Sequence, residues 1–275
     1  MCRWIAYAGE SVKLEKFILS PDHSLLKQSR DAKMLAHPDG TLLNVNGDGY
    51  GVGWYGSETT PCVVKGKDPI WNNENFKNIC HHVASPLFMA HVRLTTTGTA
   101  QRENSHPFSF ENWLFQHNGF ITDFPSLRRE LQMDIEPSLF PCLRGTTDSE
   151  TFFLLALTYG LRENPKKAIE KLLARLKKAL EGQPDGVFNF SCVMSDGTSL
   201  YTIRTSHNVK AHSQFYSTNP ECLHDFEMDA DDQNFLPEGG VLVVSEPLNS
   251  LSDKWQEVPE GSFVTIKEGH VQVEA

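Results

Sequence analysis

Two consecutive helical segments lie in the middle of this chain, with strand-rich sequence on both sides of them. The stretch TDSETFFLLALTYGLRE, residues 147–163, begins with a threonine or aspartate cap and an acidic first turn, and its apolar residues then recur at helical spacing. A second helix is expected from Asn164-Pro165 to Leu180, ended by Gly182. Because strands and helices are segregated rather than alternating, the order argues against a doubly wound parallel sheet. It predicts an α+β fold with mostly antiparallel sheets.

The expected strands are rich in aromatic and β-branched residues, and several carry long apolar runs that indicate burial on both faces. They are CRWIAYAG (closed by Gly9), PLFMAHVRLT, NWLFQHNGFI, the hairpin GVFNFSCVMSDGTSLYTIRTS with its turn at Asp196-Gly197, GGVLVVSEPL, WQEVP and GSFVTIKEGHVQVEA. SPDHSLLKQSR predicts a short helix capped by Ser20 or Asp22. Residues 207–238 are polar and irregular, so we expect a surface excursion there and one domain over residues 1–275.

Composition and charge limit the partners that this chain can have. The 275 residues carry a net charge of −10, and the basic residues form no long run, which argues against nucleic acid as a partner. No apolar stretch approaches the ~20 residues needed to span a bilayer, and the start of the chain lacks the apolar core of a signal peptide. We therefore expect a cytoplasmic protein without a membrane partner.

The cysteines suit a reducing compartment, because none of them forms a CxxC pair. We expect six free thiols, at Cys2, Cys62, Cys80, Cys142, Cys192 and Cys222. Cys80, His81 and His82 are adjacent and cannot all turn toward one metal ion, and no second cluster has the spacing of metal ligands. The sequence thus predicts no metal and no other cofactor.

Glycines at alternate positions mark the stretch NGDGYGVG, residues 46–53. The strict spacing of two, followed by a strand, does not fit a dinucleotide-binding loop. The pattern predicts a close approach of another backbone segment, which is also compatible with the floor of an active site.

Three further stretches each allow a structural and a functional interpretation. Arg93 emerges from an apolar strand and needs an anionic partner, either a structural carboxylate or a substrate. Asn118-Gly119 is either a type I′ hairpin turn or an oxyanion hole, in which the asparagine amide and the glycine N–H donate to one developing negative oxygen. Asp148 is either a helix cap or the acceptor for a substrate ammonium.

Cys2 follows the initiator methionine directly. Alone, it suits a small buried residue at the start of a strand. Removal of Met1 would give Cys2 a free α-amine with a pKa of about 7.7–8.0, beside a thiol with a pKa of about 8.5. The unprotonated amine could take the thiol proton, so one residue would supply both nucleophile and base.

Taken together, these segments resemble a known family. The order of Cys2, HVRLTTTGT, ENSHPF, HNGFI and TTDSE is similar to that of the class II glutamine amidotransferases, which are N-terminal nucleophile hydrolases. MCRWIAYAG, NGDGYGVGWY and VVSEPL resemble its small stand-alone branch, which includes glutathione-degrading and ergothioneine-pathway γ-glutamyl hydrolases. The resemblance implies four layers, with two mostly antiparallel sheets between helical layers. It also implies catalysis by Cys2, with Asn118 and Gly119 holding the tetrahedral oxyanion.

The resemblance further implies how a γ-glutamyl group is recognised. Arg93 would pair with its α-carboxylate, Asp148 with its α-ammonium, and Thr96 would lie near the carboxylate. A group that carries one anion and one cation needs one fixed basic and one fixed acidic side chain, which agrees with this assignment.

The resulting hypothesis is a cysteine-dependent hydrolase that cleaves the γ-glutamyl amide bond of glutamine or of a γ-glutamyl conjugate through a thioester. The first alternative is a glutaminase subunit that delivers ammonia to a separate synthase partner. The second is a non-catalytic binding protein that kept the fold. The sequence leaves open the leaving amine, removal of Met1, and assembly into a homo-oligomer.

Overall fold

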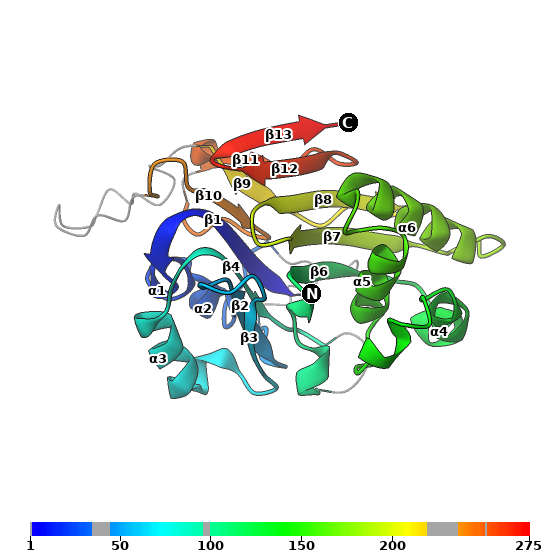
Figure 1. The fold of residues 1–275 in the computed structure, drawn as a ribbon, viewed down its shortest axis with the longest axis horizontal. Helices are drawn as coiled ribbons and strands as arrows, with labels where there is room; N and C mark the ends of the chain where they lie inside the picture. The colour runs from blue at the N-terminus through cyan, green and yellow to red at the C-terminus, as the bar shows by residue number, and fades with distance from the viewer. Residues whose placement is uncertain (1, 35–44, 96–99, 219–235, 251) are drawn as a thin grey trace.

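Two antiparallel β-sheets lie face to face in the computed structural model of this protein (Figure 1). The structure describes residues 2–34, 45–95, 100–218, 236–250 and 252–275. The first sheet has the order β11-β9-β10-β1-β4-β2-β3, formed by β1 (Arg3–Lys13), β2 (Tyr50–Trp54), β3 (Cys62–Gly66), β4 (Ala84–Val92), β9 (Phe215–Ser217), β10 (Val241–Val244) and β11 (Trp255–Glu257). The second has the order β13-β12-β8-β7-β6-β5, formed by β5 (Phe108–Phe110), β6 (Trp113–Ile121), β7 (Phe188–Ser195), β8 (Leu200–His207), β12 (Phe263–Lys267) and β13 (His270–Glu274).

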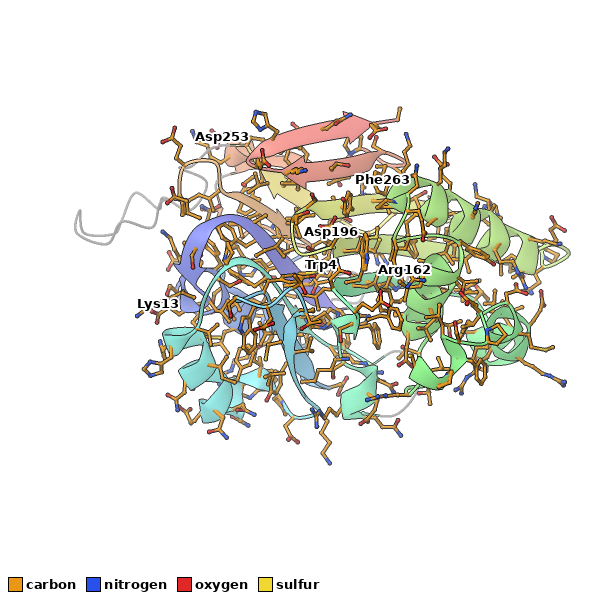
Figure 2. All side chains as sticks on the ribbon, in the orientation of Figure 1. Trp4, Lys13, Arg162, Asp196, Asp253 and Phe263 are labelled. Carbon is orange, nitrogen blue, oxygen red and sulfur yellow. The ribbon has the colours of Figure 1, made fainter. Side chains whose placement is uncertain are left out.

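The central strands of each sheet are buried on both faces, which explains why they read as continuous apolar runs. In β1, Trp4 points into the space between the sheets (Figure 2), where it packs in one cluster with Ala6 and with Leu114 and Val193 of the second sheet. The alternate residues of β1 point the other way and pack under the helices of the first sheet. The period of two along a strand thus divides the apolar residues between two layers.

Helices form the two outer layers (Figure 1). The first sheet is covered by α1 (Glu15–Ile18), α2 (Leu25–Gln28) and α3 (Glu74–His82), and the second by α4 (Phe124–Met133), α5 (Asp148–Thr158) and α6 (Pro165–Ala179). Short 3-10 turns occur at η1 (Ile70–Asn72), η2 (Arg102–Asn104), η3 (Phe140–Cys142) and η5 (Ser252–Lys254). The expected α+β class, with two antiparallel sheets between helical layers, is confirmed. None of the helices in the described ranges has both the length and the apolar composition needed to span a bilayer.

The two central helices begin where the sequence predicts. The Thr147 side chain accepts a hydrogen bond from the Glu150 N–H at 3.2 Å, and Asn164 caps α6 in the same way through Lys167 at 3.0 Å. The cap predicted for α2 is wrong, because Ser24, rather than Ser20 or Asp22, accepts the Lys27 N–H. These side-chain oxygens satisfy backbone donors that have no partner within the first turn of a helix.

Several strand predictions change in the structure. β1 continues past Gly9 to Lys13, and GSFVTIKEGHVQVEA forms two paired strands, β12 and β13, instead of one. Residues 207–238 contain β9, which pairs with both β10 and β11, so this segment contributes to the first sheet. Its residues 219–235, like Cys222 within them, lie outside the described residues. The cysteines that the structure describes are free thiols.

The glycine-rich stretch accommodates a close backbone approach, as predicted. A β-carbon on Gly51 would lie 2.1 Å from the carbonyl oxygen of His106, and one on Gly53 would lie 2.9 Å from the Pro107 side chain. Residues 106–107 therefore pass directly over β2, and this contact joins the edge of the second sheet to the first.

We predict that Gly51→Ala lowers the free energy of unfolding by about 1–3 kcal/mol, because the new methyl group would force β2 away from His106. Gly56→Ala is the matched control, since no heavy atom lies within 4 Å of a β-carbon there. Urea denaturation of both variants checks this expectation. Equal stability of the two variants would contradict it.

Candidate active site

The register of the first sheet places Cys2 and Arg93 opposite each other. Arg3 pairs with Val92, so the next pair outward joins the two residues that precede β1 and follow β4. Trp4 points between the sheets, and Cys2, two residues earlier, shares that face. The Cys2 thiol is partly buried, and its Sγ lies 3.7 Å from the Leu94 carbonyl oxygen.

Arg93 is 4% exposed, and its backbone is fixed beside the two residues that precede β2. Its N–H donates to Gly49 at 2.8 Å, and its carbonyl accepts from Asp48 at 3.0 Å. Burial lowers the pKa of the Arg93 guanidinium, while the nearby groups of Cys2, Asp48 and Asp148 raise it. An arginine stays protonated under such influences, so the site contains a buried cation beside the thiol.

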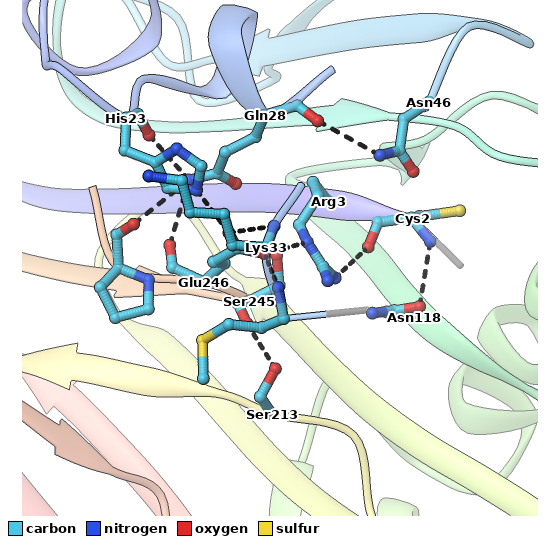
Figure 3. Close-up of polar contacts among 12 residues, drawn as sticks. Cys2, Arg3, His23, Gln28, Lys33, Asn46, Asn118, Ser213, Ser245 and Glu246 are labelled. Atoms are coloured by element: carbon cyan, nitrogen blue, oxygen red, sulfur yellow. Dashed lines mark hydrogen bonds and ion pairs between the residues drawn. The ribbon is translucent and has the colours of Figure 1, made fainter. Parts of the chain in front are cut away.

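Asn118 reaches Cys2 from the opposite sheet. Its side-chain Oδ1 accepts a hydrogen bond from the Cys2 backbone nitrogen at 3.3 Å (Figure 3). Because the amide oxygen accepts this bond, the Nδ2 amino group remains available as a hydrogen-bond donor. Asn118 and Gly119 lie inside β6, paired with Ser191 and Phe190, so the interpretation of this dipeptide as a hairpin turn is wrong.

Gly119 lies where β6 and β7 approach very closely. A β-carbon there would be 1.9 Å from the Asn189 carbonyl oxygen. Thr122 donates its N–H to Val187 on the β7 side, whereas Ile121 donates its N–H to Asp148 on the other side. Since backbone groups alternate along a strand, the Gly119 N–H faces the same edge as that of Ile121. This edge of β6 faces away from β7. β5 pairs with β6 only as far as Phe115, so β5 does not reach the N–H of Gly119.

Asp148 is the first residue of α5 and is 7% exposed. Its carboxylate accepts the Ser149 N–H at 2.7 Å and the Ile121 N–H at 3.3 Å. Burial raises its pKa to about 6, although the hydrogen bonds from Ser149 and Ile121 oppose this effect. Thr147 caps the helix, so the cap interpretation of Asp148 is not needed. Thr96, the remaining predicted site residue, lies outside the described residues.

A buried ionic network that the sequence motifs do not indicate holds the backbone of Cys2. The Arg3 guanidinium donates to the Cys2 carbonyl through Nη1 at 2.9 Å and to Glu246 through Nε at 2.7 Å (Figure 3). Glu246 also bonds His23 and accepts the backbone N–H groups of Lys33 and Met34. A charged residue directly after Cys2 in a buried strand is the signal that could have indicated such a partner.

The carboxylate of Glu246 is ionised despite being 2% exposed. Burial alone would raise its pKa, but the bonds from His23 and Arg3 and from two backbone N–H groups lower it to about 2. His117, next to Asn118, behaves oppositely: burial lowers its pKa to about 3, so its ring is neutral near pH 7. Among the described residues, no three His, Cys, Asp or Glu side chains are grouped to hold a metal ion.

Comparison with known proteins places this site in context. The family model for class II glutamine amidotransferases matches residues 34–275. A probable glutamine amidotransferase from Saccharomyces cerevisiae is 30% identical over 97% of this chain and 82% of its own length. A gamma-glutamyl-hercynylcysteine sulfoxide hydrolase from Mycolicibacterium smegmatis is 24% identical over 99% of both chains.

Solved structures share the fold. A class II domain protein from Silicibacter pomeroyi, described as a glutamine aminotransferase, superposes with a TM-score of 0.70 at 27% identity, covering 99% of this chain and 98% of its own. The glutamine phosphoribosylpyrophosphate amidotransferase of Bacillus subtilis superposes with a TM-score of 0.62 at 17% identity, over 99% of this chain and 49% of its own. The second likeness concerns the fold alone.

We predict that Glu246→Gln lowers the free energy of unfolding by about 3 kcal/mol at pH 7, because the folded pKa of about 2 lies below the ordinary 4.5. A carboxyl whose pKa is lowered by folding stabilises the fold at pH values above its unfolded pKa of 4.5. This contribution is lost as the pH falls toward the folded pKa of about 2. The difference from the unsubstituted protein should therefore shrink by about 2 kcal/mol between pH 7 and pH 3.

Urea denaturation of the variant and of the unsubstituted protein at pH 7 and pH 3 measures how their difference in free energy of unfolding changes. Glu130→Gln serves as control, because Glu130 is 60% exposed in its ion pair with Arg175 and should contribute little at either pH. A difference for Glu246→Gln that stays constant with pH would contradict the assignment of a buried, ionised carboxylate.

Proposed function

The chain belongs to the class II glutamine amidotransferases, and we propose that it hydrolyses the γ-glutamyl amide bond of glutamine or of a γ-glutamyl conjugate, with Cys2 as nucleophile. Membership of this family makes the protein an amidohydrolase-type enzyme, which disfavours a purely binding role. The observation that carries the proposal is the contact of Asn118, on the second sheet, with Cys2 on the first, where Cys2 lies opposite Arg93.

The proposed reaction uses Cys2 as both nucleophile and base, after removal of Met1. The α-amine takes the thiol proton, and Sγ attacks the γ-carbonyl carbon to form a tetrahedral oxyanion. The Asn118 Nδ2 group and the Gly119 N–H would donate to this oxyanion. Its collapse breaks the C–N bond, and the amine leaves with the proton that Cys2 held. Water then attacks the thioester, transfers a proton through the same amine, and releases glutamate and the thiol.

Recognition of the γ-glutamyl head would rest on two buried charges. Arg93 is proposed to bind the α-carboxylate, with Thr96 nearby, and Asp148 to bind the α-ammonium. Burial strengthens such pairs, because their charges are only weakly screened by water. The binding energy gained there would hold the amide in position for attack.

The likeness to a named γ-glutamyl hydrolase over 99% of both chains favours hydrolysis of a conjugate. A second candidate is delivery of ammonia to a separate synthase, favoured by a likeness to an amidophosphoribosyltransferase of Methanocaldococcus jannaschii that is 29% identical over 74% of this chain and 36% of its own length. Assay of the purified chain with glutamine and glutathione distinguishes the two. Hydrolysis by the purified chain alone favours hydrolysis of a conjugate. Hydrolysis that becomes substantial only when a partner chain is added favours delivery of ammonia to a synthase.

We predict that Cys2→Ala lowers kcat/KM for γ-glutamyl amides by at least about 10³-fold, since no other group would form the thioester. Intact mass spectrometry before and after a diazoketone analogue of glutamine should detect loss of Met1 and one covalent label. Cys62→Ala is the control, because Cys62 is an exposed thiol that should leave activity and labelling unchanged. Labelling of Cys2→Ala would show that the nucleophile is another residue.

We predict that glutamine binding depends on ionised Asp148 and weakens about tenfold between pH 7 and pH 5, because the pKa of this carboxyl is about 6. Calorimetry on Cys2→Ala, which cannot turn glutamine over, measures this affinity directly. Adding Asp148→Asn should weaken binding about 10- to 100-fold at pH 7 and remove the dependence on pH. Persistence of the same pH dependence in the double variant would exclude Asp148 as its source.

A further inference from the structure

A cavity of about 530 Å³ opens where the edges of the two sheets meet. Its walls come from β3 of the first sheet, β5 of the second, the first turns of α5 and the segments around η2 and η3. Cys2, Arg93, Asn118 and Asp148 do not line it. Its volume falls within the range of small-molecule sites, about 300–1,000 Å³.

The Lys65 ammonium faces this cavity without an anionic partner. Its Nζ lies 4.6 Å from the centre of the Phe108 ring, and among the described residues it forms no hydrogen bond or ion pair. Burial lowers its pKa to about 8, and the charge of Glu150 opposes this only in part. A largely buried ammonium without a carboxylate is costly, so its position facing an open cavity points to an anion from outside the chain.

The wall of the cavity carries three basic and three acidic side chains, but two of the acidic ones are held by other groups. Glu150 is engaged by its own loop, because its carboxylate accepts the N–H groups of Arg144 at 3.1 Å and Gly145 at 2.6 Å. Glu111 pairs with Arg162 at 3.3 Å. Glu103 remains as the only acidic lining residue without such an engagement in the described part of the chain. The cationic lining residues are Lys65, Arg102 and Arg144.

Apart from Ser109, the uncharged part of the wall is apolar. Val63 and Phe110 are only partly buried, and the buried Phe153 and Leu154 of α5 also line the cavity. Inorganic phosphate would leave this surface in contact with water, whereas an organic acid would cover it. The ligand that fits therefore combines one carboxylate with an aromatic or aliphatic body.

Two buried imidazoles separate the cavity from the candidate active site. The His106 ring lies 4.6 Å from the Phe108 ring on one side and 4.2 Å from the His91 ring on the other. His91 precedes Arg93 by two residues in the same strand segment. A molecule in the cavity is therefore distinct from one bound beside Cys2.

From this geometry we propose that the cavity is a second binding site, which takes a small organic acid. Its carboxylate pairs with Lys65, between Arg102 and Arg144, and its apolar body lies against Val63 and Phe110. This site is independent of the γ-glutamyl site, so it stands whether or not Cys2 is the nucleophile.

Benzoate is the probe for the test, with benzyl alcohol as its neutral analogue and inorganic phosphate as an anion without an apolar body. Calorimetry at pH 7 should detect benzoate binding that is at least tenfold stronger than binding of either comparison compound. Lys65→Met, which keeps the length of the side chain and removes the charge, should weaken benzoate binding at least tenfold. Lys67→Met, at an exposed residue outside the cavity, should leave it unchanged.

Protein whose Cys2 carries the diazoketone label should bind benzoate as before. If Lys65→Met does not fold, Arg144→Met at the mouth of the cavity replaces it and should weaken binding at least threefold. Absence of benzoate binding, equal binding to the lysine variant, or stronger binding of phosphate would overturn the proposal. Loss of binding on labelling Cys2 would show that the probe occupies the candidate active site instead.

Discussion

The packing of one sheet against the other sets the distance on which the site depends. Cys2 precedes a strand of the first sheet and Asn118 lies on a strand of the second, so their 3.3 Å contact exists only while the sheets stay in place. Trp4 and Val193 fill the space between them, and Gln116 adds a hydrogen bond across it to the Ile5 carbonyl at 3.0 Å. The apolar layer between the sheets thus fixes the distance between two polar groups, the Cys2 backbone nitrogen and the Asn118 amide oxygen.

The ion pair of Arg3 with Glu246 has a different purpose from the apolar layer. A buried salt bridge as a whole adds little net stability, because the desolvation of two charges offsets their attraction, whereas removing one partner, as in Glu246→Gln, leaves a buried charge unpaired and is costly. Here the pair also satisfies the Cys2 carbonyl and the N–H groups of residues 33–34, so it joins three segments behind the thiol. The ion pair fixes the orientation of the Arg3 side chain, which cannot turn without breaking its hydrogen bond to the Cys2 carbonyl.

The sequence predicts best what is local. The caps at Thr147 and Asn164 and the hairpin turn at Asp196-Gly197 follow from neighbouring residues, and the structure contains all three. The helices α3 and α4 were not expected, because a short apolar stripe of two or three residues resembles a loop. The role of Glu246 depends on Arg3, 243 residues away, and no local pattern carries that information.

The alternation along β6 has a consequence for how this protein can vary. Leu114, Gln116 and Asn118 face the other sheet, while Phe115 and His117 pack toward α5. Inserting or deleting one residue in this strand would exchange the two sets, turning the aromatic residues inward and Asn118 away from Cys2. Single substitutions affect one layer, whereas a change in strand length affects both. Variation in length should therefore be confined to the loops, and β6 should keep its number of residues wherever the site is retained.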